Sequence, residues 1–179
     1  MKSFVTILMV LFFALTAPCA LAADNPIVDG GGSGRLVPDF GRGGPGLTQL
    51  FKDGVALLTE GECARAGKKF RRVLKKVPRN AETNYLHGLA LQCQKKHKQA
   101  IRFFQRAKRD DQEFFRAYTE MGLSYLILGR TDLAKIQMTA LEQMKSTCRD
   151  RCPAKLLKSV AKLRRAIDRI EGQSGEMSP

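Results

Sequence analysis

The chain has 179 residues and a formal net charge of +14, with 31 Lys and Arg residues against 17 Asp and Glu residues. This length is enough for one domain with a continuous core, but it is too short for two domains of ordinary size. The basic excess predicts attraction to anionic surfaces or partners and carries no information about the fold.

Residues 1–23 have the pattern of a secretory signal peptide. Lys2 precedes a mostly apolar run from Phe4 to Ala17, and residues 20–22 read Ala-Leu-Ala, the small-x-small pattern of a cleavage site. Left uncleaved, the segment would be a membrane anchor, although a spanning helix needs roughly 20 apolar residues. We expect cleavage near Ala22 and a periplasmic or secreted protein, since the short Lys2-led signal resembles bacterial ones.

Residues 24–46 are rich in Gly and Pro and hold too few apolar side chains to bury a core. We interpret them as a flexible segment. The stretch from Leu36 to Phe40 is an exception, because its apolar residues could dock on the folded domain or on a partner. The alternative is a linker that docks nowhere.

From residue 47 onward the sequence repeats at an interval of 34 residues. Two columns hold small residues, one holds large apolar residues and one holds small or aliphatic residues. These four columns are Gly54, Gly88 and Gly122; Ala66, Ala100 and Ala134; Phe70, Phe104 and Met138; and Val73, Ala107 and Leu141.

This pattern resembles the tetratricopeptide repeat, whose skeleton reads G-x2-Y, A-x3-F and a closing Pro. Tyr125 fits the Tyr column, Leu57 and Leu91 take its place earlier, and Pro78 closes the first unit. The resemblance covers residues 47–80, 81–114 and 115–148. It implies an all-α, right-handed superhelical solenoid of three helical hairpins.

Glycines mark two of the expected turns within the hairpins. Gly61 and Gly129 stand where a first helix must end, whereas the middle repeat has Lys95 there, so its turn is less well specified. A further column usually holds Leu in the family. This chain has other residues there, which suggests loose packing or altered exposure on one helical face. Its residues are Asp53, His87 and Met121.

Residues 149–171 are expected to cap the solenoid. Apolar residues recur at helical spacing from Leu156 to Ile170, opposite a row of Lys and Arg, and Pro153 suits a first helical turn. A solenoid needs a terminal element that covers its last apolar face. Residues 172–179 are predicted to be a disordered tail.

Four cysteines remain after signal removal, and an even number in an oxidising compartment suggests disulfides. Cys63 and Cys93 lie at similar distances from the turn between the first two repeats, so antiparallel helices would place them at one height. We therefore predict a Cys63–Cys93 pair and, by exclusion, a Cys148–Cys152 pair. Four reduced thiols and a redox pair are the alternatives, although Cys148 and Cys152 lack the thioredoxin spacing.

No catalytic set can be identified. The two histidines, His87 and His97, form no recognisable nucleophile and base pair, and His87 is predicted inside a packed hairpin. The run Gly30–Gly34 neither follows a strand nor opens a helix, so it is no phosphate loop. The cysteines lack the paired close spacings of a zinc site. We expect no enzyme activity, no metal and no cofactor.

The first helices of stacked tetratricopeptide repeats usually line a concave groove, and the resemblance implies an apolar lining here. Phe51 and Val55 replace the polar pair by which some family members clamp a carboxylate, so a helix or an extended apolar peptide is the expected ligand. The cap helix, a second copy or the Leu36–Phe40 stretch could instead cover this lining. Its residues are Phe51, Val55, Leu58, Tyr85, Leu89, Gln92, Thr119, Leu123 and Ile127.

The second helices of the first two repeats carry a strong basic excess, and acid returns only at Asp110 and Asp111. These helices should form the convex face. A charged outer face is often only solvated surface, but this one could attract anionic lipid, acidic glycan or an acidic protein. Its residues are Lys68, Lys69, Arg71, Arg72, Lys75, Lys76, Lys98, Arg102, Arg106, Lys108 and Arg109.

The sequence therefore predicts a periplasmic adaptor or scaffold that binds an unidentified protein or peptide in an apolar groove. The alternative is binding of an anionic polymer or membrane by the basic face. Salt separates the two, because only the second should weaken steeply with ionic strength. Export argues against nucleic acid as a target.

Overall fold

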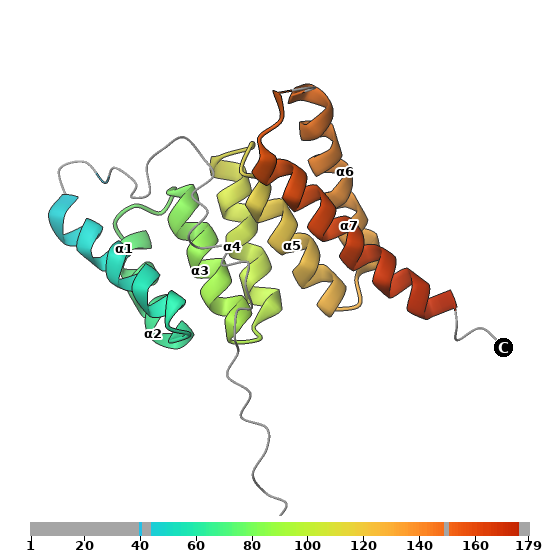
Figure 1. The fold of residues 1–179 in the computed structure, drawn as a ribbon. Coiled ribbons are helices and arrows are strands. Elements are labelled where there is room, and N and C mark those ends of the chain that lie inside the picture. Colours follow the sequence, from blue (N-terminus) through green and yellow to red (C-terminus); the bar gives the residue numbers. More distant parts are fainter. Residues whose placement is uncertain (1–39, 41–43, 149–150, 176–179) are drawn as a thin grey trace, which may run out of the picture.

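The computed structural model describes Phe40, residues 44–148 and residues 151–175, and all secondary structure in these ranges is helical (Figure 1). The signal segment expected at 1–23, most of the segment expected at 24–46 and the last residues of the expected tail lie outside the described residues. The helices are α1 (Gly44–Thr59), α2 (Cys63–Leu74), α3 (Ala81–Cys93), α4 (His97–Asp110), α5 (Phe115–Ile127), α6 (Thr131–Cys148) and α7 (Ala154–Gly175).

Helices adjacent in the sequence are neighbours in space. α1 packs on α2, α3 on α4 and α5 on α6, while α2 contacts α3 and α4 contacts α5, so the hairpins stack in chain order. Figure 1 shows this stack, with α7 lying across α5 and α6 at its end. The predicted all-α solenoid of hairpins with a terminal helix is confirmed. No helix in the described ranges is long and apolar enough to cross a bilayer.

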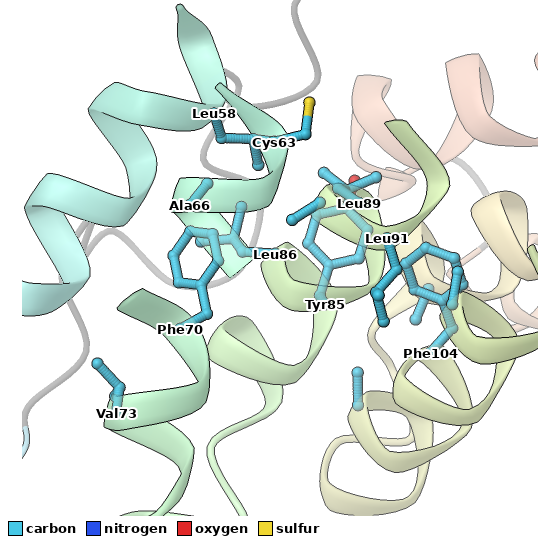
Figure 2. Packing of buried hydrophobic residues seen from close by; sticks show 14 of the residues in the cluster. Leu58, Cys63, Ala66, Phe70, Val73, Tyr85, Leu86, Leu89, Leu91 and Phe104 are labelled. Atoms are coloured by element: carbon cyan, nitrogen blue, oxygen red, sulfur yellow. The ribbon is translucent and has the colours of Figure 1, made fainter. Parts of the chain in front are cut away.

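The repeating columns are the buried contacts of the hairpins. Phe70 and Phe104 are fully buried in one continuous core that runs from α1 to α5, part of which Figure 2 shows. A Cβ atom added at Gly88 would lie 2.4 Å from the Phe104 ring. Only a residue without a side chain lets α3 and α4 approach this closely, which explains the glycine column.

Turns between paired helices use the left-handed backbone conformation. Gly61 has φ +80° and Gly129 has φ +70°, as the sequence predicts. Lys95 takes the same conformation with φ 59°, although a side chain makes it unfavourable. At the start of α3, the Asn80 side chain accepts a hydrogen bond from the backbone N–H of Thr83 at 2.8 Å and caps the helix.

The terminal helix α7 completes a second core cluster with α5 and α6. A Cβ atom added at Gly122 would lie 2.7 Å from Leu163 of α7, whereas the two earlier glycines face the phenylalanine of their own hairpin. In the third hairpin the cap therefore supplies the side chain that covers the glycine. The predicted capping role is consistent with this contact.

Two element boundaries differ from the expected ones. α1 begins at Gly44 rather than after residue 46, because Pro45 suits a first helical turn, where its missing N–H costs nothing. α7 continues to Gly175, so the start of the expected tail at 172 is wrong. An ion pair between Glu171 and Lys135 of α6 holds this last part of α7 against the bundle.

Candidate functional site

The nine residues predicted to line a groove lie on the first helices α1, α3 and α5, which we call the first-helix surface. Most of them belong to the core rather than to an open lining. Five are buried, three are half-buried and one is exposed: Phe51, Leu58, Tyr85, Leu89 and Thr119; Val55, Gln92 and Leu123; and Ile127, respectively.

The N-terminal end of this surface is covered by an aromatic residue that precedes the helices. Phe40 is only 7 % exposed and belongs to the same core cluster as Phe51, Tyr85 and Leu89. Its ring lies 5.7 Å from the Phe51 ring, tilted by 56°. The last residue of the predicted Leu36–Phe40 patch thus packs on the folded domain.

Charged residues on this surface form pairs within the chain. The Arg116 guanidinium on α5 donates to the Glu82 carboxylate on α3 at 2.5 Å, and Arg116 also lies over the Tyr85 and Phe114 rings, 4.7 and 4.8 Å from their centroids. Burial raises the pKa of Glu82, and the positive charge of Arg116 opposes that shift. Arg116 is therefore fixed by an ion pair and two rings together.

A second pair lies where the cap meets this surface. The Lys162 ammonium of α7 donates to the buried Glu120 carboxylate of α5 at 2.8 Å. The Gln92 amide of α3 donates to the Glu120 backbone carbonyl at 3.1 Å and to the Ser124 hydroxyl at 3.0 Å. These bonds tie α3, α5 and α7 together. Each of the two carboxylates, Glu82 and Glu120, thus has a cation as its partner.

The basic residues of the second helices form an exposed face on α2 and α4. Nearly all of the predicted side chains are exposed, and among the described residues two of them are in ion pairs, Lys69 with Asp53 at 2.7 Å and Arg109 with Asp110 at 3.4 Å. We call these residues the basic face. Among the described residues, most of its side chains are therefore in no ion pair with a carboxylate.

The buried His87 lies near positive charges of both α2 and α4, those of Arg71 and Arg106. It is buried on α3, edge-on to the Phe103 ring at 4.3 Å. Burial, together with smaller contributions from the positive charges of Arg71 and Arg106, lowers the pKa of His87 to about 4. His87 is therefore a neutral core residue. In its column Met121 is buried as well, whereas Asp53 is half-buried.

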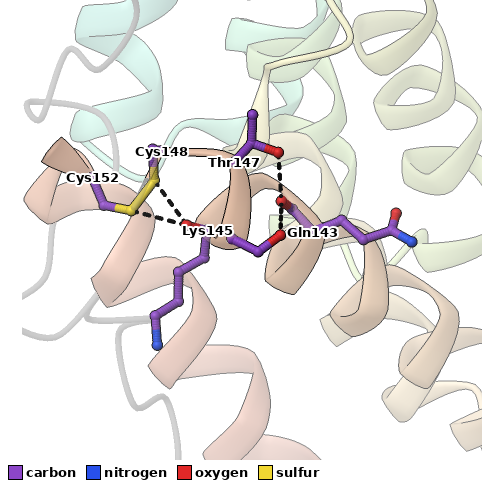
Figure 3. The surroundings of a disulfide bond; sticks show 6 residues. Gln143, Lys145, Thr147, Cys148 and Cys152 are labelled. Carbon is purple, nitrogen blue, oxygen red and sulfur yellow. Dashed lines mark hydrogen bonds between the residues drawn. A yellow bond between two sulfur atoms is a disulfide. The ribbon is translucent and has the colours of Figure 1, made fainter. Parts of the chain in front are cut away.

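Both predicted cysteine pairs are the pairs that the structure joins. Cys63 of α2 is bonded to Cys93 of α3 with a Cα–Cα distance of 6.1 Å, which links the first two hairpins. Cys148 is bonded to Cys152 with a Cα–Cα distance of 4.9 Å, just before the cap (Figure 3). Both sulfur atoms lie 3.2 Å from the Lys145 carbonyl oxygen, and Figure 3 marks these two contacts with dashed lines.

The described residues bring together no group of three or more His, Cys, Asp or Glu side chains that could hold a metal ion. His87 lies in the core and His97 begins α4, so the two histidines stand on different helices.

The two ion pairs on the first-helix surface were not predicted from the sequence. One signal was available, because Glu82 and Arg116 are 34 residues apart and so occupy the same column of the repeat. Opposite charges in equivalent positions of stacked repeats should meet across the interface. The pair between Glu120 and Lys162 had no such signal, since Lys162 lies outside the repeats.

The sequence matches no known family model and no curated protein. Several solved structures are similar in fold. The tetratricopeptide-repeat domain of Sgt2 from Aspergillus fumigatus superposes with a TM-score of 0.60 at 18 % identity, over 75 % of this chain and 86 % of that one. The TPR2B domain of yeast Sti1, in a complex with pHsp70, gives 0.58 at 18 % identity, over 66 % and 96 %. The second such domain of RPAP3, bound to the HSP90 peptide SRMEEVD, gives 0.53 at 19 % identity, over 55 % and 92 %.

Proposed function

The chain has the fold of tetratricopeptide-repeat domains, and we propose on this basis that it is a non-enzymatic scaffold that binds an apolar segment of a protein partner. The binding site is the first-helix surface. In the similar structures of yeast Sti1 and RPAP3, domains of this fold are in complex with pHsp70 and with an HSP90 peptide. The mode of binding that fits is a helix or extended peptide laid against apolar side chains.

The choice of an apolar segment as the ligand rests on one observation. Two charged side chains of the surface are already neutralised inside the chain, Arg116 by Glu82 and Glu120 by Lys162. A free carboxylate on a ligand would have to break one of these pairs. The loss of that ion pair would cost more free energy than a solvated contact with the ligand would gain. The most exposed of the nine residues is Ile127, at 64 %, and the half-buried Leu123 lies one helical turn before it.

The test uses a panel of fluorescent peptides, some amphipathic and apolar and some acidic at the C-terminus, titrated into the purified protein. We expect the apolar peptides to bind with little dependence on salt, and Ile127→Glu to weaken that binding at least tenfold. Ile136→Glu is the matched control, because Ile136 of α6 is 59 % exposed and lies outside the surface. Equal loss in both variants, or preferred binding of acidic peptides, contradicts the proposal.

A second candidate function rests on the basic face. Its exposed cations face solvent with few acidic neighbours, so an anionic polymer or membrane would gain from release of counterions. Binding of the protein to vesicles with anionic head groups should then fall steeply between low and physiological salt. A double variant with Arg72→Glu and Arg102→Glu should lose its binding to anionic vesicles and keep its binding to peptides.

The localisation is part of the same proposal. We place the protein outside the cytoplasm, with its signal segment cleaved near Ala22. Two disulfides suit an oxidising compartment. N-terminal sequencing of the protein from fractionated cells tests this: a chain that starts near Ala23 supports export, and an intact Met1 in the cytoplasmic fraction contradicts it.

A further inference from the structure

The junction of α2, α3 and α4 carries an inference that rests on the second candidate function and names the group that the basic face binds. His87 of α3 lies at this junction. Its ring is edge-on to Phe103 of α4 at 4.3 Å, and a Cβ atom added at Gly67 of α2 would lie 3.7 Å from its Nδ1 atom. Among the described helices, α2 and α4 both pack on α3 and not on each other. His87 therefore lies between two strongly basic helices.

The Nδ1 atom of His87 is a buried polar atom without a partner. The residue is 5 % exposed, and the structure gives this atom no hydrogen bond to any described residue. Such an atom is unfavourable, because it has lost its hydrogen bonds to water. The neighbouring Gln94 amide donates to two backbone carbonyl oxygens instead. Gly67 leaves room for a methyl-sized group beside Nδ1, whereas the equivalent positions of the later repeats hold Ile101 and Lys135.

Two exposed arginines of the basic face flank this position. Arg71 follows Gly67 by four residues on α2, and a side chain at this spacing lies on the same face of the helix. Arg106 follows Phe103 by three residues on α4, and its guanidinium lies 4.9 Å from the centre of the Phe103 ring. The two arginines stand about 6 Å and about 4.5 Å along their helices from the residues that contact His87. They therefore lie at similar heights on either side of it.

The charges of both arginines reach His87. Together with burial, which is the larger cause, they lower the pKa of His87 to about 4, so the ring is neutral near pH 7. A neutral imidazole with its hydrogen on Nδ1 is a donor at that atom. Neither arginine is in an ion pair with a described carboxylate. An anion at this place would thus meet two unpaired cations and one N–H donor.

We propose that Arg71, Arg106 and the Nδ1–H group of His87 form a binding site for a tetrahedral oxyanion, the phosphate group of a ligand. The two guanidinium groups bind the outer oxygen atoms, and one oxygen atom enters beside Gly67 and accepts from His87 once the surrounding side chains shift slightly. A phosphate group suits three donors on three helices better than a carboxylate does, because its oxygen atoms do not lie in one plane. The other cations of the basic face attract the ligand from a distance.

Inorganic phosphate is the probe, and the ring signals of His87 in nuclear magnetic resonance spectra of the histidine-labelled protein are the readout. At constant ionic strength, kept with chloride, we expect phosphate to shift these signals to saturation and to leave those of the other histidine unchanged. Arg71→Gln and Arg106→Gln should each weaken the binding at least tenfold. Arg72→Gln and Arg102→Gln are the matched controls, because they remove the same charge from other faces of the same two helices. Equal weakening in all four variants, or no saturable shift, overturns the inference.

Gly67→Ala tests the role of His87 and leaves both arginines in place. The added methyl group would make ordinary contacts, 3.6 Å from both His87 and Gln94, and alanine favours a helix more than glycine does. The variant should therefore be at least as stable to urea as the unchanged protein. We expect it to bind phosphate at least tenfold more weakly, because the methyl group fills the space through which the oxygen atom reaches Nδ1. Unchanged affinity in the folded variant contradicts the site.

Vesicles distinguish a lipid phosphate from a soluble one, and they separate failure of this inference from failure of the second candidate function. Phosphatidylcholine vesicles that contain phosphatidic acid present the phosphate group as a lipid head group. Greater loss of vesicle binding in Arg71→Gln and Arg106→Gln than in the two controls supports the site with a lipid ligand. Loss of inorganic phosphate binding alone supports it with a soluble ligand. Equal loss of vesicle binding in all four variants, with no response of His87 to phosphate, rejects the site and leaves the basic face as a general anion-binding surface.

Discussion

Glu82 and Arg116 meet across the boundary between the second and third hairpins, with a carboxylate oxygen of Glu82 2.5 Å from a guanidinium nitrogen of Arg116. The pair joins the first turn of α3 to the first turn of α5. Both side chains are mostly buried, and the Arg116 guanidinium also lies over two neighbouring rings, those of Tyr85 and Phe114. The interface between these hairpins therefore depends on a charge pair that the repeat pattern alone does not require.

A double-mutant cycle measures this pair. Arg116→Met keeps an apolar side chain beside the Tyr85 and Phe114 rings and removes the charge, and Glu82→Gln removes the opposite charge. We expect each single substitution to cost roughly 1–3 kcal/mol in the free energy of unfolding by urea, with a coupling of about 1–2 kcal/mol. Additive effects would show that the two groups do not interact in solution.

Stability should depend on pH through His87. The folded-state pKa of about 4 lies below the ordinary value of 6.5, so the unfolded chain binds the proton more readily between these two values. Stability then rises as pH increases from about 4 to about 6.5, by on the order of 3 kcal/mol in total. His87→Leu, measured by urea unfolding at both ends of this range, should remove that difference. His97→Gln is the control and should keep most of it.

The left-handed turn at Lys95 can be improved. Replacing Lys95 by Gly relieves a backbone conformation that costs a side-chain-bearing residue about 1 kcal/mol. We expect Lys95→Gly to raise the unfolding free energy by roughly that amount. Gly61→Ala is the reciprocal test, because its φ of +80° should make the alanine destabilising although nothing crowds the site. Thermal unfolding of both variants checks the two signs together.

The glycine column should tolerate no side chain where α3 meets α4. Gly88→Ala places a methyl group against the buried Phe104 ring, and such overpacking costs about 1–3 kcal/mol, more than alanine gains in helix propensity. Gly172→Ala in α7 is the control, since nothing lies within 4 Å of its Cβ position, and it should be neutral or stabilising. Destabilisation of both to the same extent would contradict the packing explanation.

The two disulfides should differ in their contribution to stability. Cys63 and Cys93 are separated by 30 residues and Cys148 and Cys152 by 4, so the first closes the larger loop. Loop-closure entropy predicts a loss of about 3–4 kcal/mol when the first pair is replaced by alanines and about 2 kcal/mol for the second. Urea unfolding of the two double variants tests this order, and a larger loss for the short loop would reverse it.

Much of this fold could be predicted from the sequence, because the same short-range pattern of small and large residues recurs in each repeat. Gly54, Gly88 and Gly122 recur at a fixed interval and each marks a close approach of a first helix to a large side chain. Gly61 and Gly129 mark turns for an equally local reason, their backbone conformation. The cysteine pairing followed from the same geometry, since neighbouring antiparallel helices fix which positions share a height.

The sequence by itself determined the helical hairpins, their order, the cap and the basic face, because helix periodicity and repeat spacing depend on residues close in the chain. Only the tertiary structure decided how open the first-helix surface is. Whether Phe51 or Tyr85 is exposed depends on Phe40, Phe114 and Arg116, which approach from other elements of the chain. Burial is a property of the assembled chain, so a register that assigns residues to a face does not say what already covers that face.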